Sequence, residues 1–498
     1  MSKKKLAILR TDASVELGNG HIIRCLALAD ALASGDWLCL FAVGPKTLTV
    51  FPAIQDTDHS VLLVECDEEE EPGFIQKSIE QPCALLVVDH YQRDARFEAA
   101  CRTWAGGIAV IDDLSDRRHE CDVLLDQNQL RAEEVYRSLI PSEAIVLAGP
   151  DYAMLRQQFF SLKYEALKKF NQADQVKNIF VSFGSTDLQN FSSVALQVIS
   201  EISSSITIDV SIGSRAPNLK SLQSLGCELS NDVKIHVDHA DMVGLMMKAD
   251  IAVGAAGLTA WERCCIGLPS IAVITAENQQ HLAIELRNHG AATVIEGQSS
   301  DTRGALLSAA KSLIKEPKKR INMSVRAGLL CDGLGAGRVA QAITSIVTPN
   351  VNNVCLRPAG IKDADIMYEW QSSPGMRQYF RNPEIPTWQK HVSWLSEKLN
   401  DPGCIFSIIL YNQKPAGLVR LDLADSSEKI HFEVSLLVSH DKKRLGIGKA
   451  ALLCARQMAP NSIFHAEISP DNKASDALFK SLGYLPENDQ YRTSFPKQ

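Results

Sequence analysis

Short aliphatic runs alternate with longer segments of helical periodicity from the N-terminus to about residue 345. Continuous Val, Ile and Leu runs of this kind are typical of parallel strands covered by helices on both faces. A polar helix-like stretch at 154–169 and a loop at 171–176 separate two series of predicted strands. The first series comprises 6–9, 38–43, 61–64, 85–88, 108–111 and 123–125, and the second comprises 179–183, 206–212, 233–236, 251–253 and 270–274. The pattern predicts two doubly wound α/β domains with a cleft between them, where ligands commonly bind beyond the carboxyl ends of strands.

The pattern changes at a Pro- and Asn-containing break at 348–353. Helix-like segments at 363–371 and 388–399 are followed by hairpin-like runs at 405–411 and 416–422 and a strand at 431–438. This order is typical of an α+β domain. We therefore expect three domains, at residues 1–170, 171–347 and 354–498.

The composition and net charge limit the classes of molecule that the protein is expected to bind. A formal net charge of −8 over 498 residues argues against nucleic acid or an anionic membrane surface as the main partner. The acidic run at 67–71 is most simply a solvated loop. We expect a protein that binds small molecules, as a monomer or a weak homo-oligomer.

The apolar runs and the cysteines indicate where in the cell the protein is expected and whether it needs disulfides or a metal. No apolar run approaches membrane-spanning length, and the run at 6–9 is too short for the core of a secretory signal. The 13 cysteines include the adjacent pair Cys264 and Cys265 but no paired C-x-x-C array. They predict neither a disulfide framework nor a zinc cage. We expect a cytoplasmic protein that needs no metal.

A histidine lies in a glycine loop where the first predicted strand meets a helix, in Gly18-Asn19-Gly20-His21. At a helix N-terminus the free amide donors and the positive end of the dipole disfavour a second proton on the ring. A histidine that stays neutral near pH 7 can act as a base. A loop histidine that only hydrogen-bonds its neighbours is the alternative.

Carboxylates also follow predicted strands of the first series. Asp12 lies after the first strand, Asp89-His90-Tyr91 follows the strand at 85–88, and Asp112-Asp113 follows the strand at 108–111. Strand ends of a parallel sheet open onto one edge, so these side chains are placed to meet a ligand. Each of them can equally cap a helix or a turn.

The second series carries a loop of small residues, Gly254-Ala255-Ala256-Gly257-Leu258-Thr259, between a strand and a helix that begins near Ala260. Such residues let backbone amides approach a diphosphate, whose charge suits a helix N-terminus. Turns need glycines too, so the loop alone is not specific. Thr259 and Glu262 fit a capping box, so Glu262 either closes the first turn of its helix or binds a ribose.

A series of motifs occurs in order along residues 1–345, namely RTDAS at 10–14, GNGHIIRC at 18–25, DHY at 89–91, IDDL at 111–114, YAMLR at 152–156, WERCCIGLP at 261–269, ENQ at 277–279 and DGLGA at 332–336. So many matches in order are more specific than any one glycine motif. Together they resemble the UDP-sugar hydrolase family of pseudaminic acid biosynthesis, which removes UDP from UDP-2,4-diacetamido-2,4,6-trideoxy-β-L-altropyranose.

The resemblance implies a GT-B fold, with the donor nucleotide held mainly by the second domain. It implies that His21 is the base and that Tyr91 lines the same pocket, and we add Asp12 as a further catalytic candidate. Ser185, Leu258 and Ala260 depart from the residues common in relatives. The substrate-binding candidates are Gly20, Arg24, Gly184, Ser185, Gly257, Leu258, Thr259, Glu262, Asn278 and Gln279.

A second glycine loop, KRLGIGK at 443–449, follows the strand at 431–438 and begins a helix. Amides in such a loop can hold a pyrophosphate, although a tight turn with a basic edge is the alternative. A further helix opens at NKAS, 472–475, and ends at LGY, 482–484. Together, over about residues 354–490, these segments resemble the GNAT acyltransferases.

The GNAT resemblance implies acetyl-CoA as the co-substrate. Phe479 stands where many relatives carry the tyrosine that protonates the thiolate, so either Tyr484, another hydroxyl or water serves as the acid, or the thiolate leaves without a dedicated acid. Glu433, His465 and Glu467 lie on predicted strands and are candidate bases, with Glu433 first, and buried pairing or ordinary surface exposure is the alternative for each of them. The cofactor-binding candidates are Val438, Lys443, Arg444, Gly446, Ile447, Gly448, Lys449, Asn472 and Ser475.

These features predict a bifunctional enzyme. The C-terminal domain would acetylate the 4-amino group of a UDP-sugar, and the N-terminal domains would then hydrolyse the product by inversion, with His21 activating water. One alternative is a GT-B glycosyltransferase that uses a UDP-sugar donor. Another is a non-catalytic protein that binds nucleotide sugars.

Overall fold

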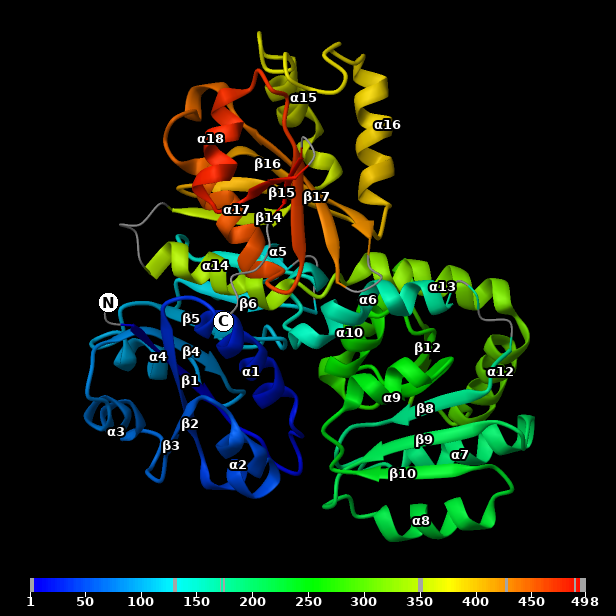
Figure 1. Cartoon of the computed structure of the whole chain (residues 1–498). Helices are drawn as coiled ribbons and strands as arrows, with labels where there is room; N and C mark the ends of the chain where they lie inside the picture. Colours follow the sequence, from blue (N-terminus) through cyan, green and yellow to red (C-terminus); the bar gives the residue numbers. More distant parts are fainter. Residues whose placement is uncertain are drawn as a thin grey trace. The chain divides into compact units, whose positions relative to one another are not determined.

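The computed structural model of the chain describes residues 4–128, 132–170, 172, 175–347, 353–425, 429–487 and 490–492. The chain divides into two compact units, unit 1 at Met1–Ala336 and unit 2 at Gly337–Gln498 (Figure 1). The predicted break at 348–353 lies outside the described residues except for Asn353. The predicted domain at 1–170 and most of the predicted domain at 171–347 fall within unit 1, and the division lies after the second residue of helix α14 (Gly335–Val347), so residues 337–347 belong to unit 2.

The first lobe of unit 1 is a seven-stranded parallel sheet with the order β3-β2-β1-β4-β5-β6-β7. The six predicted strands are confirmed, and β7 is an additional edge strand. The strands are β1 (Lys5–Thr11), β2 (Trp37–Val43), β3 (Ser60–Leu63), β4 (Cys83–Asp89), β5 (Ile108–Ile111), β6 (Val123–Asp126) and β7 (Ile145–Ala148). The helices are α1 (Gly20–Ala33), α2 (Pro45–Val50), η1 (Pro52–Asp56), α3 (Glu71–Ser78), α4 (Ala95–Cys101), α5 (Ala132–Tyr136) and η2 (Pro150–Tyr152).

The second lobe is a six-stranded parallel sheet with the order β10-β9-β8-β11-β12-β13. Its strands are β8 (Asn178–Ser182), β9 (Thr207–Ile212), β10 (Val233–Val237), β11 (Ile251–Ala255), β12 (Ser270–Ile274) and β13 (Thr293–Glu296). The helices are α6 (Gln157–Phe170), α7 (Phe191–Ile202), α8 (Leu219–Glu228), α9 (Met242–Lys248), α10 (Leu258–Cys265), η3 (Glu277–Gln279), α11 (Gln280–His289), α12 (Thr302–Lys315) and α13 (Pro317–Leu330).

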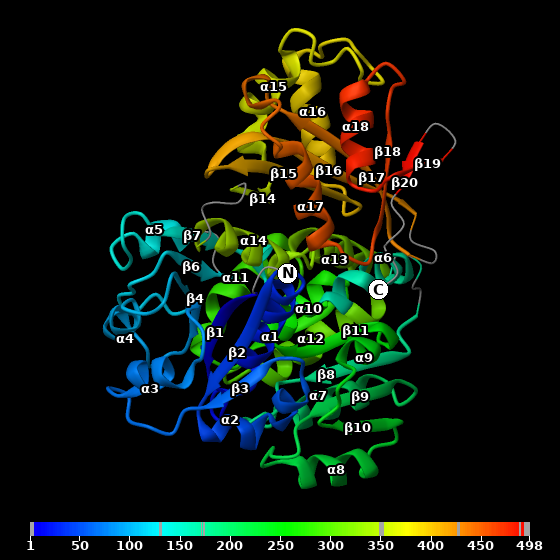
Figure 2. The ribbon, with the colours of Figure 1, turned by 60° about the vertical axis from the view of Figure 1, so that its left-hand side comes forward.

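Successive strand residues of the second lobe enter different cores, which explains the uninterrupted apolar runs. Ile179 and Val181 pack in a cluster with α7, α8 and α12, whereas Phe180 between them packs in a cluster with α6, α9 and α10. Helices therefore lie on both sides of the sheet (Figure 2). Because side chains alternate between the faces of a strand, a sheet covered on both sides needs apolar residues at every position.

The strand order of each sheet reverses at its centre, between β1 and β4 in the first lobe and between β8 and β11 in the second. In doubly wound sheets, ligands bind beyond the carboxyl ends of the strands at such a switch point. The two positions direct attention to the segments after these four strands.

Unit 2 contains a mixed seven-stranded sheet with the order β14-β15-β16-β17-β18-β20-β19. Its strands are β14 (Val354–Pro358), β15 (Cys404–Tyr411), β16 (Lys414–Asp425), β17 (His431–Val438), β18 (Ile463–Glu467), β19 (Leu485–Glu487) and β20 (Gln490–Arg492). Its further helices are η4 (Ile361–Asp363), α15 (Ala364–Ser372), α16 (Trp388–Leu399), η5 (His440–Lys442), α17 (Ile447–Met458) and α18 (Lys473–Ser481). Only residues 431–433 of β17 pair with β18, so the two strands part beyond Glu433. The predicted α+β organisation is confirmed.

Candidate functional site

His21 lies in the first turn of α1, the helix that follows β1 after the segment at 12–19. The helix has no side-chain cap at Asn19, and His21 is 6% exposed. Its Nδ1 is 2.6 Å from Oδ1 of Asp89, the last residue of β4. Its Nε2 has no hydrogen-bond partner among the described residues. The pair forms because β1 and β4 are neighbours at the switch point.

Asp89 is fully buried and receives three contacts besides the one from His21. Arg24 donates from Nε to Oδ2 at 2.7 Å and from Nη2 to Oδ1 at 2.6 Å, and the Cys25 thiol donates to Oδ2 at 3.4 Å. Burial alone would raise the pKa of Asp89, but the charges of Arg24 and His21 outweigh it and hold this pKa well below its ordinary value. An ionised Asp89 accepts the Nδ1–H of His21 and leaves the Nε2 lone pair able to take a proton.

Tyr91 connects this pair to the second lobe. Its ring packs edge-on against His21 at a centroid distance of 4.6 Å, and its hydroxyl accepts a 2.8 Å hydrogen bond from Nδ2 of Asn278. Burial raises the pKa of the Tyr91 hydroxyl, so it stays protonated. Three predicted site residues from separate parts of the sequence therefore lie together.

Asp12 lies at the same sheet edge but in a separate network. Its Oδ2 is 3.0 Å from both Arg10 Nη1 and His90 Nε2, and its Oδ1 accepts from the Gly44 amide at 2.6 Å. Burial would raise the pKa of Asp12, whereas the His90 hydrogen bond and the Arg10 charge lower it below its usual range. An ionised carboxylate with these partners holds the end of β1 to the start of α2. Its catalytic role stays a prediction.

The acidic run at 67–71 is not simply a solvated loop, because Glu71 is 1% exposed. Its carboxylate accepts from Arg10 Nε and from Arg93 Nη2, each at 2.5 Å. The interpretation from sequence was wrong at this residue. The partners lie 61 and 22 positions away in the chain, beyond the reach of local charge patterning.

In the second lobe, Gly257 is the N-cap of α10 and makes no side-chain cap bond. The amides of Leu258 and Thr259 therefore open the helix at the carboxyl end of β11, next to the loop after β8. Gly184 in that loop has φ +90°, a left-handed conformation that favours glycine. These amides have the placement that a diphosphate requires.

The capping box expected at Thr259 and Glu262 does not form, because the helix starts at Leu258 with Gly257 as its N-cap. The Thr259 hydroxyl instead accepts from Arg263 Nη1 at 3.3 Å. Glu262 is 3% exposed, and its nearest charged partner is Arg156 Nη2 at 3.9 Å. Burial raises the pKa of Glu262 to about 7, partly offset by the charges of Arg156 and Arg263.

One further polar contact closes a turn of the second lobe, and another connects this lobe to the first. Oε1 of Gln279 accepts from the Thr275 amide at 2.9 Å, so this side chain closes the turn before η3. Trp261 donates from Nε1 to Oδ1 of Asn128 at 3.0 Å and joins the two lobes. Sequence analysis did not single out Asn128, because nothing local distinguishes it from a loop amide.

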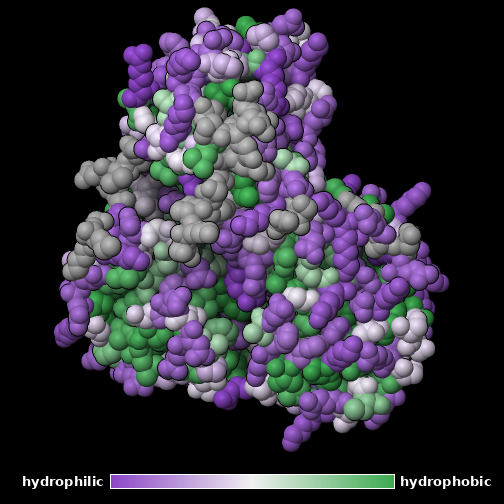
Figure 3. All heavy atoms as spheres, viewed as in Figure 1, coloured by the Kyte–Doolittle hydropathy of each residue, from purple (hydrophilic) through white to green (hydrophobic). Residues whose placement is uncertain are grey.

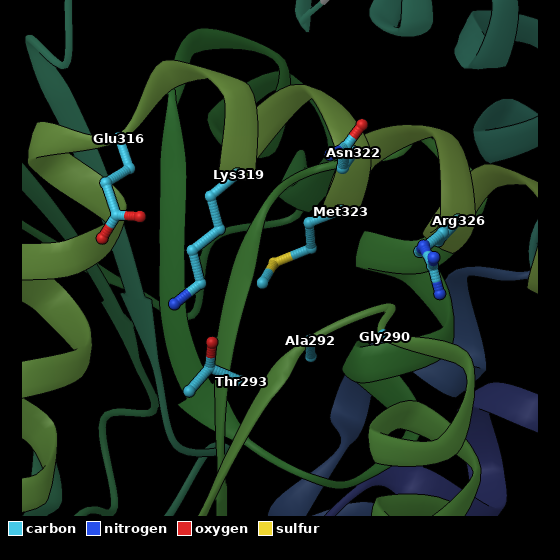
Figure 4. Close-up of a pocket in the computed structure, with 8 residues that line it drawn as sticks. All are labelled: Gly290, Ala292, Thr293, Glu316, Lys319, Asn322, Met323 and Arg326. Carbon is cyan, nitrogen blue, oxygen red and sulfur yellow. The ribbon is translucent and has the colours of Figure 1, made fainter.

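On the face drawn in Figure 3, the surface of unit 1 is hollowed between its lobes, and hydrophilic residues lie in the hollow. A separate cavity of about 440 Å³ is lined by residues that include Thr293, Lys319, Asn322 and Arg326 (Figure 4). Thr293 begins β13, so this cavity lies toward the amino ends of the parallel strands, away from the segments after β8 and β11. It is therefore not part of the candidate site.

In unit 2 the glycine loop leads from β17 into α17. Arg444 and Gly446 have φ +66° and +78°, and Gly446 is the N-cap of α17 without a side-chain cap bond. A left-handed turn with open helix-start amides and basic residues at 443, 444 and 449 fits the pyrophosphate of CoA.

The other GNAT candidates have contacts within the protein. Glu433 forms an ion pair with Arg381 at 2.7 Å, and Arg381 also contacts Glu467. Asn472 caps α18 by accepting from the Ser475 amide at 3.1 Å. The Tyr484 hydroxyl is buried without a hydrogen-bond partner in the described part of the chain, and burial raises its pKa. The roles of these residues in acyl transfer stay predictions.

The described residues contain no group of three or more His, Cys, Asp or Glu side chains arranged to hold a metal ion. Among them, no helix combines the length and the apolar character that crossing a membrane requires.

Two family models match the chain. Residues 178–331 match the glycosyltransferase family 28 C-terminal domain, and residues 353–485 match the acetyltransferase (GNAT) domain. The resemblance to the GNAT acyltransferases is confirmed by the second match, and the resemblance to the UDP-sugar hydrolases is confirmed by the Campylobacter jejuni relative described next. The GNAT match implies acetyl-CoA as the co-substrate of unit 2.

Relatives extend the comparison. The UDP-2,4-diacetamido-2,4,6-trideoxy-beta-L-altropyranose hydrolase of Campylobacter jejuni is 28% identical over 285 residues, which are 57% of this chain and 96% of that protein. The uncharacterized protein MJ1062 of Methanocaldococcus jannaschii is 22% identical over 496 residues, 96% of each chain. The solved structure of MurG from Acinetobacter baumannii covers 68% of this chain and 99% of its own, with a TM-score of 0.50 and 16% identity. That structure supports the GT-B fold alone.

Proposed function

We propose that unit 1 hydrolyses a UDP-activated diacetamido sugar of the kind named for the Campylobacter relative, and that unit 2 acetylates the 4-amino group of its precursor with acetyl-CoA. The single observation that carries the hydrolase is the His21–Asp89 contact of 2.6 Å at the switch point of the first sheet. The 28% identity to the hydrolase over 285 residues supports the choice of substrate.

The proposed mechanism of hydrolysis moves a proton from water to His21 and places negative charge on the departing UDP. Nε2 of His21 takes a proton from water while the oxygen of that water attacks the anomeric carbon. The bond from that carbon to the UDP oxygen breaks on the opposite face, so the product is inverted and no covalent sugar intermediate forms. The negative charge that accumulates on UDP is stabilised by the helix-start amides of Leu258 and Thr259.

Glu262 is the proposed partner of the ribose hydroxyl groups. It is buried at the start of α10, and no capping bond occupies its carboxylate. Two ribose hydroxyls could each donate to one carboxylate oxygen, and such charge-assisted hydrogen bonds favour the ionised form. Ligand binding would therefore lower the pKa of Glu262 from its value of about 7.

We expect UDP to bind more tightly as pH rises through 7. At about one pH unit below the pKa only about a tenth of Glu262 is ionised, so affinity should increase about tenfold between about pH 6 and about pH 8. Calorimetry in buffers of different ionisation enthalpy measures both the affinity and the release of the proton from Glu262.

Glu262→Gln is the control, because glutamine keeps the shape and cannot titrate. The UDP diphosphate also titrates near this range, so only the difference between the two proteins reports on Glu262. Identical pH dependence in both proteins would exclude the assigned role of Glu262.

Unit 2 would hold acetyl-CoA through the loop at 443–449, which provides helix-start amides and basic side chains. Bound acetyl-CoA supplies the acetyl group. Glu433, whose Oε1 forms the ion pair with Arg381, is the proposed acceptor of the proton from the sugar ammonium.

A glycosyltransferase is the second candidate for unit 1, because residues 178–331 match the glycosyltransferase family 28 model. The two activities differ in whether water or another acceptor attacks the sugar. Incubation of the protein with the UDP-4-amino sugar, with and without acetyl-CoA, followed by mass spectrometry, distinguishes them.

We expect an acetyl-CoA-dependent gain in mass that precedes the release of UDP and free sugar. If UDP is released only when a sugar or lipid acceptor is added, unit 1 is a glycosyltransferase. If UDP binds and no candidate sugar releases it, unit 1 is a binding module.

A further inference from the structure

Arg24 lies one turn after His21 on α1 and is 4% exposed. Its guanidinium donates from Nε and Nη2 to both oxygens of Asp89, at 2.7 and 2.6 Å. The third nitrogen, Nη1, donates to Oδ2 of Asp113 at 3.0 Å. Every nitrogen of the guanidinium thus faces a carboxylate of the protein, which does not favour the substrate contact predicted from sequence.

We propose that Arg24, anchored by Asp113, is a positioning residue that fixes Asp89 as an ionised acceptor and thereby sets the tautomer of His21. The proposal rests on the proposed function, in which Nε2 of His21 takes the proton from water. In this proposal Arg24 acts on the base His21 through Asp89 and does not contact the sugar nucleotide.

The charge balance of the cluster explains why a cation is needed. His21, Arg24 and Cys25 face Asp89 from α1, Tyr91 faces His21 from the segment after β4, and Asp113 faces Arg24 from the segment after β5. Arg24 is the one permanent cation of this group. Its charge therefore decides whether a carboxylate with no exposure stays ionised.

Loss of that cation changes where the His21 proton lies. Burial would raise the pKa of Asp89, and a protonated Asp89 would donate to Nδ1 of His21. The ring proton would then be on Nε2, which could no longer accept a proton from water. The base would be present but in the wrong tautomer.

Arg24→Lys and Arg24→Met test this directly. Lysine keeps the charge but lacks the planar fork, and methionine lacks both. We expect kcat for UDP release to fall in both variants, up to the about 10²- to 10⁴-fold that general-base catalysis contributes, with little change in KM. We further expect the lysine variant to retain more activity and the methionine variant to shift the activity profile to higher pH.

Two variants control for folding. Arg93→Lys changes another buried arginine of the same lobe, which donates to Glu71 and is not part of the proposed machinery. We expect it to keep kcat. Asp113→Asn keeps the shape of the anchor and should give a smaller loss of kcat than Arg24→Met, so the proposal stays testable if the methionine variant does not fold.

A spectroscopic measurement separates positioning from general destabilisation. The His21 Nδ1–H that donates to Asp89 should give a downfield proton resonance, absent in His21→Asn and shifted or lost in Arg24→Lys. If Arg24→Lys keeps kcat, the pH profile and this resonance while His21→Asn is inactive, the positioning role is overturned and the proposed base stands. If His21→Asn is active, the proposed function itself fails.

Discussion

Replacement of His21 by asparagine is expected to remove UDP release and leave UDP affinity nearly unchanged. The asparagine amide can still donate to Asp89 near the place of Nδ1, but the side chain has no group that takes a proton from water. Loss of a general base should lower kcat by about 10²- to 10⁴-fold. The nucleotide contacts are assigned to the second lobe, so affinity for UDP should persist. A coupled assay of UDP and calorimetry with UDP measure the two quantities.

His119→Asn is the matched control for this experiment. His119 is 3% exposed, lies in the same lobe, and contacts a carboxylate through Nδ1, at 2.8 Å from Oε1 of Glu98. Its replacement removes the same number of atoms from a similar buried pair outside the proposed site. If both variants lose activity to the same extent, the effect is one of stability. An active His21→Asn protein would exclude His21 as the base.

The sheets of unit 1 could be predicted because their strands are covered on both faces and read as continuous apolar runs. The two missed strands, β7 and β13, are edge strands of their sheets. Several of their residues, among them Ile145 and Thr293, are only partly buried. In β13 the apolar run is cut to two residues by Thr293 and Glu296, whereas β7 is apolar throughout, so its pattern was present in the sequence and the prediction missed it.

The sequence predicted which residues belong to the candidate site better than it predicted which of them contact one another. The spacing placed His21 and Asp89 at the ends of two strands, but only the strand order makes these strands neighbours. Arg24 was expected to bind substrate, because sequence does not reveal that carboxylates 65 and 89 positions away occupy its donors. Ion pairs of this kind depend on tertiary contacts that no local pattern contains.

The start of α10 shows that a short sequence motif can also mislead about contacts between residues close in the chain. Thr259 and Glu262 have the spacing of a capping box, yet α10 begins two residues earlier than that box requires, with Gly257 rather than Thr259 as its N-cap. This two-residue difference leaves Glu262 without a capping role.

A glutamate in place of Gly446 is expected to abolish acetyl transfer and leave hydrolysis of the diacetamido UDP-sugar intact. Gly446 has φ +78° and precedes the first residue of α17, so a side chain there costs about 1–2 kcal/mol of backbone strain. The added carboxylate would face the CoA pyrophosphate. Like charges about 4 Å apart near a protein surface repel by about 4 kcal/mol, which corresponds to roughly thousand-fold weaker binding.

Gly483→Glu is the matched control, because it introduces the same residue at φ +76° with open space around the new side chain. It carries the same backbone strain and charge outside the proposed loop. Acetyl-CoA consumption with the UDP-4-amino sugar and UDP release from the diacetamido sugar are measured on both variants. Loss of acetyl transfer in Gly446→Glu alone assigns the loop to acetyl-CoA, whereas equal transfer in both variants would mean that the loop holds no pyrophosphate.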